Sequence, residues 1–261
     1  MLKSSRLQGP SAAKIVVARL GPVYRWARRL RALSRYLARR PHDPDFAAFG
    51  RIAGDGLFLD VGASIGQSAL SFRIFNRASP ILSLEPLPGH RGDLEFVGRV
   101  IRGHSFMMVG AAEESCRATL YVPMLGSYEL PAESSLRRED SVAVLDRLER
   151  EGVDPGRLGL AEVEVELRRL DELELEPSFV KIDVEGAELE VLHGLRETIE
   201  RSRPALMLER SERFDQVLEL LVDGAGYRAY VYDAAAAELR PYTADDSFNV
   251  FFLRKEHGPV G

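Results

Sequence analysis

From residue 57 onward, short apolar runs alternate with longer stretches in which apolar residues recur at helical spacing. The short runs predict strands at 57–61, 81–84, 105–109, 179–182, 205–208, 227–232 and 249–253. The longer stretches predict helices at 66–75, 90–100, 186–200 and 214–224. This alternation is typical of an α/β fold with a mostly parallel sheet covered by helices on both faces. Such sheets bind ligands at the carboxyl ends of their strands, so the residues after each strand are the candidates for function.

The N-terminal residues follow a different pattern. Apolar residues recur along one face of a predicted helix, at Val23, Trp26, Leu30, Leu33 and Leu37. Residues 1–42 hold eleven of the 35 basic residues and no acidic residue, whereas the remainder holds 24 basic and 40 acidic residues. We therefore expect a basic, amphipathic helical arm and linker at 1–45, followed by a domain at 46–261.

Two interpretations of this arm are open. In the one that we favour, the helix packs its apolar stripe on the domain and pairs its arginines with the acidic body. In the other, residues 14–40 contact an anionic membrane surface or an acidic partner. We expect no nucleic acid partner, because the body of the chain is acidic.

Composition narrows the class of protein. The single cysteine, Cys116, excludes an intrachain disulfide and a zinc site built on several thiolates, and it fits a reducing cytoplasm. No run of 18 apolar residues occurs, so no transmembrane helix is expected. We therefore predict a cytoplasmic protein, peripheral at the membrane if the arm binds one.

Residues 111–178 form the least regular part of the chain. The segment mixes an apolar run, a polar stretch (GSYELPAESSLRRED) and a helical stretch (SVAVLDRLEREG). We interpret it as an insertion between the third and fourth strands of the sheet, where it can shape a substrate pocket.

The first strand leads into the sequence FLDVGASIGQSAL. Asp60 ends the strand, Gly62 permits a tight turn, and Gly66 begins a helix whose N-terminus has free N–H groups. The dinucleotide pattern G-x-G-x-x-G lacks its middle glycine, because position 64 is serine, and no phosphate loop of the type G-x-x-x-x-G-K-[ST] occurs. A nucleoside ligand without phosphates therefore fits this loop better.

The residues after the second and third strands add contacts for such a ligand. Glu85 lies 25 residues beyond Asp60, at the position where an acid accepts hydrogen bonds from ribose hydroxyls. NAD proteins and S-adenosylmethionine proteins share this acid, so Glu85 does not separate them. After the third strand, the small residues from Gly110 to Ala112 leave room for a flat ring, and Glu113 can accept a hydrogen bond from an exocyclic amine.

The fourth strand ends in a dense group of carboxylates, FVKIDVEGAELEVL. Asp183 lies at the carboxyl edge of the sheet, and Glu185 follows in the turn. Glu188 and Glu190 have structural explanations, the first as a charge at the start of a helix and the second as a solvated residue. After the fifth strand, ALMLERS places Glu209 at the same edge as Asp183.

With these residues in view, the chain resembles the FkbM family of S-adenosylmethionine-dependent methyltransferases. The matching segments are FLDVGASIGQSAL, LSLEPLPG, ESCRATLYVP, ESSL and FVKIDVEGAELEVLHGL…RPALMLE. They extend over about 57–232, and KIDVEGAELEVL is the most specific of them. The N-terminal arm lies outside the resemblance.

The resemblance implies a Rossmann-like class I methyltransferase fold, with a seven-stranded, mostly parallel sheet whose last strand is antiparallel. It implies transfer of a methyl group from S-adenosylmethionine to a hydroxyl of a small polar acceptor, such as a sugar, a glycolipid or a natural-product scaffold. Asp183 and Glu185 would border the methyl-transfer site. The implied cofactor-binding residues are Asp60, Gly62, Ala63, Gly66, Glu85, Ala112, Glu113 and Asp183.

A hydroxyl acceptor needs a base or a metal that increases its nucleophilicity. Asp183 is the first candidate base. Lys181 can pair with Asp183 or Glu185 and keep it ionised. Alternatively, Asp183 and Glu209 hold a Mg²⁺ ion, since hard cations favour oxygen ligands. His104 and His193 are further candidate bases.

Two other classes of protein are alternatives. An NAD-dependent oxidoreductase is compatible with Glu85 but disfavoured by Ser64. A catalytically silent scaffold would bind membrane or nucleic acid through the basic arm. The sequence predicts neither the identity of the acceptor nor the oligomeric state.

Overall fold

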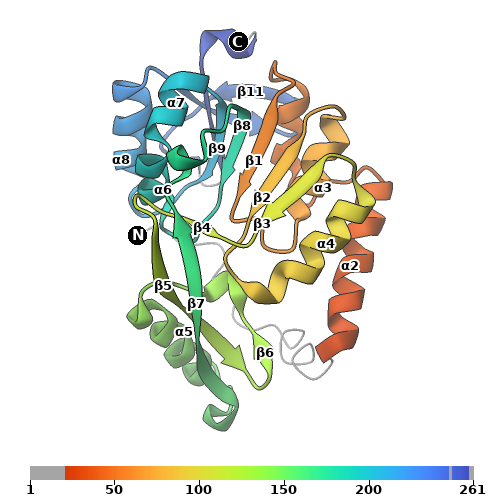
Figure 1. Ribbon diagram of the computed structural model, residues 1–261, viewed down its shortest axis with the longest axis vertical. Coiled ribbons are helices and arrows are strands. Elements are labelled where there is room, and N and C mark those ends of the chain that lie inside the picture. Colours follow the sequence, from red (N-terminus) through yellow and green to blue (C-terminus); the bar gives the residue numbers. More distant parts are fainter. Residues whose placement is uncertain (1–20, 247–248, 259–261) are drawn as a thin grey trace. The chain divides into compact units, whose positions relative to one another are not determined.

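The computed structural model describes residues 21–246 and 249–258, so part of the expected arm, residues 1–20, lies outside the description (Figure 1). The chain divides into two compact units. One comprises Ala118–Val165 with the chain up to Arg31, and the other comprises Ala32–Arg117 with Glu166–Gly261. The second unit holds the large sheet and every candidate site residue named above.

Eight strands form the large sheet, in the order β11-β10-β12-β9-β8-β1-β2-β3. The pairs from β9 through β8, β1 and β2 to β3 are parallel, whereas β12 runs antiparallel to both β9 and β10. The predicted α/β fold is therefore confirmed, and the last strand is antiparallel as expected. The strands are β1 (Leu57–Val61), β2 (Ile81–Leu84), β3 (His104–Met107), β8 (Pro177–Ile182), β9 (Ala205–Glu209), β10 (Arg228–Asp233), β11 (Glu238–Pro241) and β12 (Asn249–Leu253).

The predicted count of seven strands is wrong, because β11 adds an eighth at the edge of the sheet. It pairs antiparallel with β10 after a turn in which Asp233 Oδ1 accepts hydrogen bonds from the N–H groups of Ala235 (2.9 Å) and Ala236 (3.1 Å). An aspartate that binds the backbone ahead of it initiates a turn without glycine or proline. The alanine-rich sequence around this turn lacks the apolar alternation by which a strand is recognised.

Alternate residues of the central strands supply two apolar cores, one on each face of the sheet. Phe58 and Phe179 belong to one core, and their neighbours Leu59 and Val180 belong to the other. The first core includes residues of the 3-10 segment Pro44–Gly50, α3 (Gln67–Phe75) and α4 (Arg91–Val100). The second includes residues of α6 (Glu188–Gly194), α7 (Arg196–Ser202) and α8 (Phe214–Leu218). Both faces are thus covered, as the pattern predicts for a parallel sheet.

The helix predicted at 186–200 is broken into α6 and α7 at Leu195, where φ is −109° and ψ is 4°. A Cβ on Gly194 would lie only 2.1 Å from the carbonyl oxygen of Ala112. Glycine at this position therefore allows the end of α6 to touch the chain that follows β4 (Gly110–Ala111). The helix predicted at 214–224 continues after α8 as a π-helical turn.

The irregular segment contains a second sheet, in the order β4-β7-β5-β6. Its longer strands are β5 (Cys116–Leu125) and β7 (Leu158–Arg168), and β6 (Tyr128–Glu129) is short. Helix α5 (Arg138–Arg150) lies between β6 and β7 along the chain. This part has a small core of its own, formed by Leu125, Leu130, Leu148 and Val153.

The described part of the arm is the helix α2 (Gly21–Leu37). Ala32 is 8% exposed and belongs to a core of the large sheet. In contrast, Trp26 and Leu30 are each 60% exposed, and Leu37 is 71% exposed. The favoured interpretation, in which this apolar stripe packs on the domain, is therefore wrong for Leu37. For Trp26 and Leu30, which belong to the first unit, it stays a prediction. Among the described residues, no helix has the length and apolar character needed to cross a membrane.

Candidate active site at the carboxyl edge of the large sheet

The glycine loop between β1 and α3 touches the end of β8. Gly62 has a φ of 77°, and a Cβ on it would lie 1.9 Å from the carbonyl oxygen of Asp183. The N–H groups of Gly62 and Ala63 both donate to the carbonyl oxygen of Leu84 at 3.0 Å, which fixes the loop to β2. Gly66, with a φ of 78°, is the residue that precedes α3. The structure thus places this loop directly beside Asp183.

Glu85 is bound to the same loop. Its Oε2 accepts a hydrogen bond from the N–H of Ser64 at 2.8 Å, and its Oε1 accepts one from the N–H of Leu87 at 2.9 Å. Ser64 takes a left-handed φ of 49°, and the side chain of His90 lies 3.3 Å from Oε1. A carboxylate oxygen has two lone pairs, so Oε2 of Glu85 can accept a second hydrogen bond, as from a ribose hydroxyl, beside that of Ser64.

Lys181 lies at the centre of a buried charge cluster. Its side chain is 6% exposed, and its Nζ donates a hydrogen bond to the carbonyl oxygen of Gly62 at 3.0 Å. Nζ lies 3.3 Å from Oδ2 of Asp183 and 3.6 Å from Oδ1 of Asp60. Burial lowers the pKa of Lys181, but attraction to the two carboxylates outweighs burial, so the pKa lies above its usual value. The amine therefore stays charged between the glycine loop and Asp183.

Asp60 supports this cluster from inside the sheet. It is fully buried, and its Oδ2 accepts a hydrogen bond from Ser83 at 3.0 Å. Ser83 Oγ also lies 3.1 Å from Nε2 of His104, whose pKa burial lowers to about 4. Burial raises the pKa of Asp60, and the charge of Lys181 opposes that rise. Asp60 therefore lies behind the glycine loop, where it holds Lys181 and has no exposed surface for a ligand.

Asp183 and Glu185 follow β8 in a turn with unusual backbone angles. The side chain of Asp183 is 31% exposed. Glu185 is exposed and has a φ of 52°, a left-handed conformation that costs energy for a residue other than glycine. Glu188 is buried and accepts a hydrogen bond from the N–H of Gly186 at 3.0 Å. Glu188 thus holds the turn, while Asp183 and Glu185 reach the surface at the carboxyl edge.

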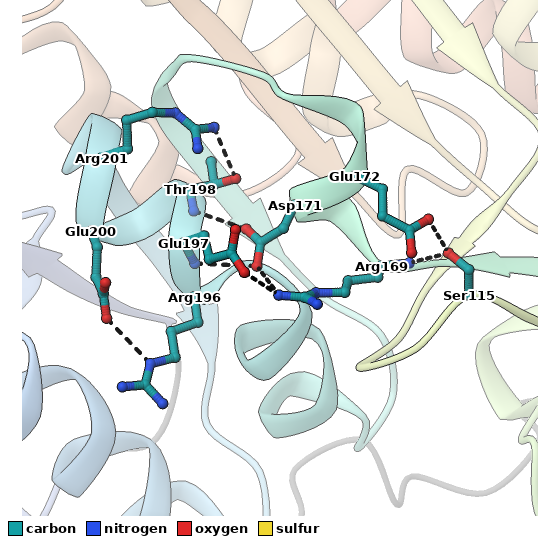
Figure 2. A network of polar contacts seen from close by, with 9 residues as sticks. All are labelled: Ser115, Arg169, Asp171, Glu172, Arg196, Glu197, Thr198, Glu200 and Arg201. Carbon is teal, nitrogen blue, oxygen red and sulfur yellow. Dashed lines mark hydrogen bonds and ion pairs between the residues drawn. The ribbon is translucent and has the colours of Figure 1, made fainter.

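The chain after β4, with Ala112 and Glu113, is also fixed. The N–H of Ala112 donates to the carbonyl oxygen of Arg168 at 3.0 Å. Ser115 donates to Oε2 of Glu172 at 2.6 Å and accepts a hydrogen bond from the N–H of Arg169 at 2.9 Å (Figure 2). Glu113 itself is exposed, so its carboxylate is accessible to a ligand.

Arg169 extends this network to the start of α7 (Figure 2). Its guanidinium group lies 3.3 Å from Asp171 and 2.5 Å from Glu197. Asp171 is buried and accepts hydrogen bonds from the N–H groups of Glu197 (3.2 Å) and Thr198 (2.8 Å). Asp171 therefore caps α7 from outside the helix, and the chain after β4 is linked to α7 through Ser115 and Arg169.

The segment 41–46, expected as a linker that ends the arm, contributes polar side chains to this edge of the sheet. Asn249, at the start of β12, donates from Nδ2 to Asp43 at 2.8 Å and to Asp45 at 2.9 Å. Asn249 is the register partner of Glu209 at the end of β9. The segment therefore lies at the carboxyl edge of the large sheet. The only signal in the sequence was the pair of acids on either side of Pro44.

His42 belongs to the same segment. Its N–H donates to Oγ of Ser71 in α3 at 2.9 Å, and its Nδ1 lies 2.8 Å from the same oxygen. Burial lowers the pKa of His42 to about 4, with a further contribution from the positive charge of Lys181, while Asp183 acts in the opposite direction. The neutral imidazole of His42 is thus within the electrostatic reach of the Lys181–Asp183 pair.

The proposed Mg²⁺ site gains no support. Among the described residues, no group of three or more histidine, cysteine, aspartate or glutamate side chains is arranged to hold a metal ion. Asp183 and Glu209 end neighbouring strands, but the described residues add no third ligand to them.

The eight-stranded sheet, the glycine loop after β1 and the acid after β2 define a mixed α/β protein whose candidate site lies at the carboxyl ends of its parallel strands. The sequence matches the Methyltransferase FkbM domain over residues 60–229. This chain therefore belongs to the FkbM methyltransferase family, as the resemblance of its motifs predicted, and the family implies S-adenosylmethionine as the cofactor. Membership of this family argues against the alternative that the chain is an NAD-dependent oxidoreductase.

Several solved methyltransferase structures are similar to this chain. A methyltransferase FkbM from Methylobacillus flagellatus KT has 17% sequence identity and a TM-score of 0.48, and the match covers 80% of this chain. It covers only 50% of the Methylobacillus chain, so this chain corresponds to half of that protein. A precorrin-6y C5,15-methyltransferase from Geobacter metallireducens GS-15 has 15% identity and a TM-score of 0.40, and the match covers 79% of this chain and 82% of the other.

A chain of a fibrillarin/Nop5p complex has 11% identity and a TM-score of 0.38, with 77% of this chain and 74% of the other covered. No curated protein matches the sequence. The family assignment rests on the sequence match over residues 60–229.

Proposed function

We propose that this chain is an S-adenosylmethionine-dependent O-methyltransferase that acts on a hydroxyl group of a small polar acceptor, such as a sugar, a glycolipid or a natural-product scaffold. The observation that carries the proposal is the position of Lys181, which binds the carbonyl oxygen of Gly62 and lies 3.3 Å from Asp183. This contact keeps a carboxylate suited to proton transfer beside the loop suited to the cofactor.

The residues at the strand ends fit S-adenosylmethionine, which supplies a methyl group on a positively charged sulfur. Gly62, Ala63 and Gly66 leave the backbone accessible for the methionine end. Glu85 offers the second acceptor position of Oε2 to the ribose, and the network through Ser115 holds Ala112 and Glu113 for the adenine. Asp60 contributes indirectly, because it holds Lys181 and is fully buried.

Asp183 is the proposed base. A hydroxyl group is a weak nucleophile, and a carboxylate that accepts its proton as the new bond forms lowers the barrier. Asp183 can do so only while ionised, and the buried ammonium group of Lys181 favours that state. Glu185, exposed on the strained turn, borders the same site and is placed to bind another polar group of the acceptor.

The segment 41–46 is the proposed acceptor side of the site. It brings polar side chains to the carboxyl edge, where Asn249 holds Asp43 and Asp45. Carboxylate groups accept hydrogen bonds from hydroxyls, so this composition suits an acceptor rich in hydroxyl groups. The neutral imidazole of His42 adds a further hydrogen-bonding group.

A methyl-transfer assay with labelled S-adenosylmethionine and a panel of sugars, glycolipids and polyhydroxylated natural products tests this proposal. With any acceptor found, we expect Asp183→Asn to lower kcat by at least about 100-fold while the affinity for S-adenosylmethionine changes little. Glu190→Gln is the matched control, because Glu190 lies in the same motif but pairs with Arg213. An Asp183→Asn enzyme with full activity, or a product methylated on nitrogen or carbon, would contradict the proposal.

A further inference from the structure

Helix α2 has two faces of different character. Ala32 is buried in a core of the large sheet, and Tyr36 packs against the same core. Trp26, Leu30 and Leu37 follow at spacings of four and seven residues, which places them on one face of the helix, and each is at least 60% exposed. Within the described chain, the exposed large apolar side chains comprise these three and Leu136. Trp26, Leu30 and Leu37 thus form an apolar stripe that faces water.

The stripe lies in an exclusively basic sequence. Helix α2 carries Arg25, Arg28, Arg29, Arg31 and Arg35 and no acidic residue, and the first acidic residue of the chain is Asp43. The guanidinium group of Arg29 lies over the indole ring of Trp26, at 5.7 Å from its centroid. Tryptophan and arginine combine an apolar body with a polar end, a combination that suits the boundary between lipid headgroups and acyl chains.

We infer that the exposed face of α2, formed by Trp26, Leu30 and Leu37, docks on an anionic lipid surface. The helix would lie in the plane of the surface, with the three apolar side chains among the acyl chains and the flanking Arg29 and Arg31 at the level of the phosphate groups. An apolar stripe flanked by arginines is complementary to such a surface both in its apolar character and in its charge. The docking would present the same chain that carries the candidate active site to acceptors held at a membrane.

Charge and composition disfavour other binding partners for this face of α2, namely the N-terminal residues, a nucleic acid and a second copy of the chain. The N-terminal residues 1–20 hold four basic residues and no acidic residue, so their charge repels that of α2. A nucleic acid would bind the arginines but would gain nothing from three exposed apolar side chains beside them. A second copy of the chain offers an acidic body, but the stripe has only three large side chains, fewer than a stable protein interface contains.

Co-sedimentation of the full chain with vesicles tests the inference. One set of vesicles contains phosphatidylcholine alone, and the other contains about 30% phosphatidylglycerol, which gives a negative surface potential. We expect binding to the anionic vesicles, weakened at least about tenfold at high salt, and little binding to the neutral ones. The combined variant Trp26→Ser, Leu30→Ser and Leu37→Ser should lose this binding at least about tenfold, since its side chains are exposed and the fold does not depend on them.

Leu136→Ser is the matched control, because Leu136 is an exposed leucine (39%) outside α2, and it should bind the vesicles like the original chain. Failure of the original chain to bind anionic vesicles, or equal binding by the triple variant, would overturn the inference. The inference would also be overturned if vesicle binding were absent and the triple substitution instead abolished DNA binding, or abolished a concentration-dependent dimer seen in sedimentation velocity. Binding of S-adenosylmethionine, measured on the same samples, reports separately on the proposed activity.

Discussion

Lys181 and Asp183, two residues apart at the end of β8, form an ion pair of 3.3 Å in which the lysine is buried and the aspartate reaches the surface. Strand geometry places the two side chains on the same face of the sheet. The same ammonium group binds the carbonyl oxygen of Gly62 and is held from within by Asp60. One buried charge thus connects the glycine loop, the interior of the sheet and the proposed base.

Replacement of Lys181 by methionine should destabilise the fold. The substitution leaves the fully buried Asp60 without its counter-charge, and breaking a buried pair from one side costs about 3–5 kcal/mol. Urea unfolding monitored by circular dichroism measures the change. The double variant Asp60→Asn with Lys181→Met removes both charges and should recover part of the loss. Equal stability of the single variant and the original chain would show that the cluster has no role in holding the site.

The stability of the acceptor side should depend on pH through Asp45. Burial chiefly raises the pKa of Asp45 from 3.8 to about 6, so folding favours its protonated form. Its contribution to stability is therefore complete below pH 3.8 and is lost as the pH rises through about 6. After a discount for partial exposure, Asp45→Asn should raise the free energy of unfolding by about 1–2 kcal/mol at neutral pH and by nothing at the acidic end.

Thermal or urea unfolding across this pH range provides the measurement for Asp45→Asn. Asp55→Asn, at an exposed aspartate nearby in the chain, is the control. A stabilisation of the Asp45 variant that is the same at every pH would argue against a raised pKa at this position.

Gly194 is predicted to position the chain that carries Glu113. A Cβ at Gly194 would lie 2.1 Å from the carbonyl oxygen of Ala112, so Gly194→Ala must displace the backbone on one side of this contact. We expect a loss of about 1–3 kcal/mol in stability and a weaker affinity for S-adenosylmethionine.

Gly98→Ala in α4 is the matched control, because its Cβ meets nothing closer than 3.5 Å. Alanine is the better helix former, so this variant should be as stable as the original chain or more stable. Calorimetric titration and urea unfolding of both variants separate the two effects. Unchanged affinity in Gly194→Ala would mean that this contact does not position the cofactor site.

The periodicity of the sequence was sufficient to predict most of the large sheet, because its central strands are short, mostly apolar runs that alternate with helical stretches, as a parallel sheet covered on both faces requires. Leu57–Val61 and Ala205–Glu209 illustrate this, and both match their predicted positions closely. Strand β11 was not predictable in the same way, since its turn depends on a hydrogen bond that the side chain of Asp233 accepts from the N–H of Ala235. The break between α6 and α7 likewise depends on a tertiary contact, that of Gly194 with Ala112.

The candidate site, like the fold, was predictable from the sequence only in part. The positions of Asp183, Glu85 and the glycine loop followed from the rule that ligands bind at the carboxyl ends of parallel strands. The burial of Asp60 behind Lys181 did not follow from this rule. A side chain at the end of a strand can point either toward the loop that follows it or away from that loop. The approach of His42 and Asp45 to this edge depends on contacts with Ser71 and Asn249 that are remote in sequence.

Isothermal titration with S-adenosylmethionine and S-adenosylhomocysteine tests the central claim most directly. The original chain and a Glu190→Ala control should bind both ligands with dissociation constants on the order of micromolar, and Glu85→Ala should weaken binding at least about tenfold, because it loses the proposed ribose contact and the hydrogen bond that holds Ser64. Absence of binding by the folded original chain, or full affinity in Glu85→Ala, would contradict the account.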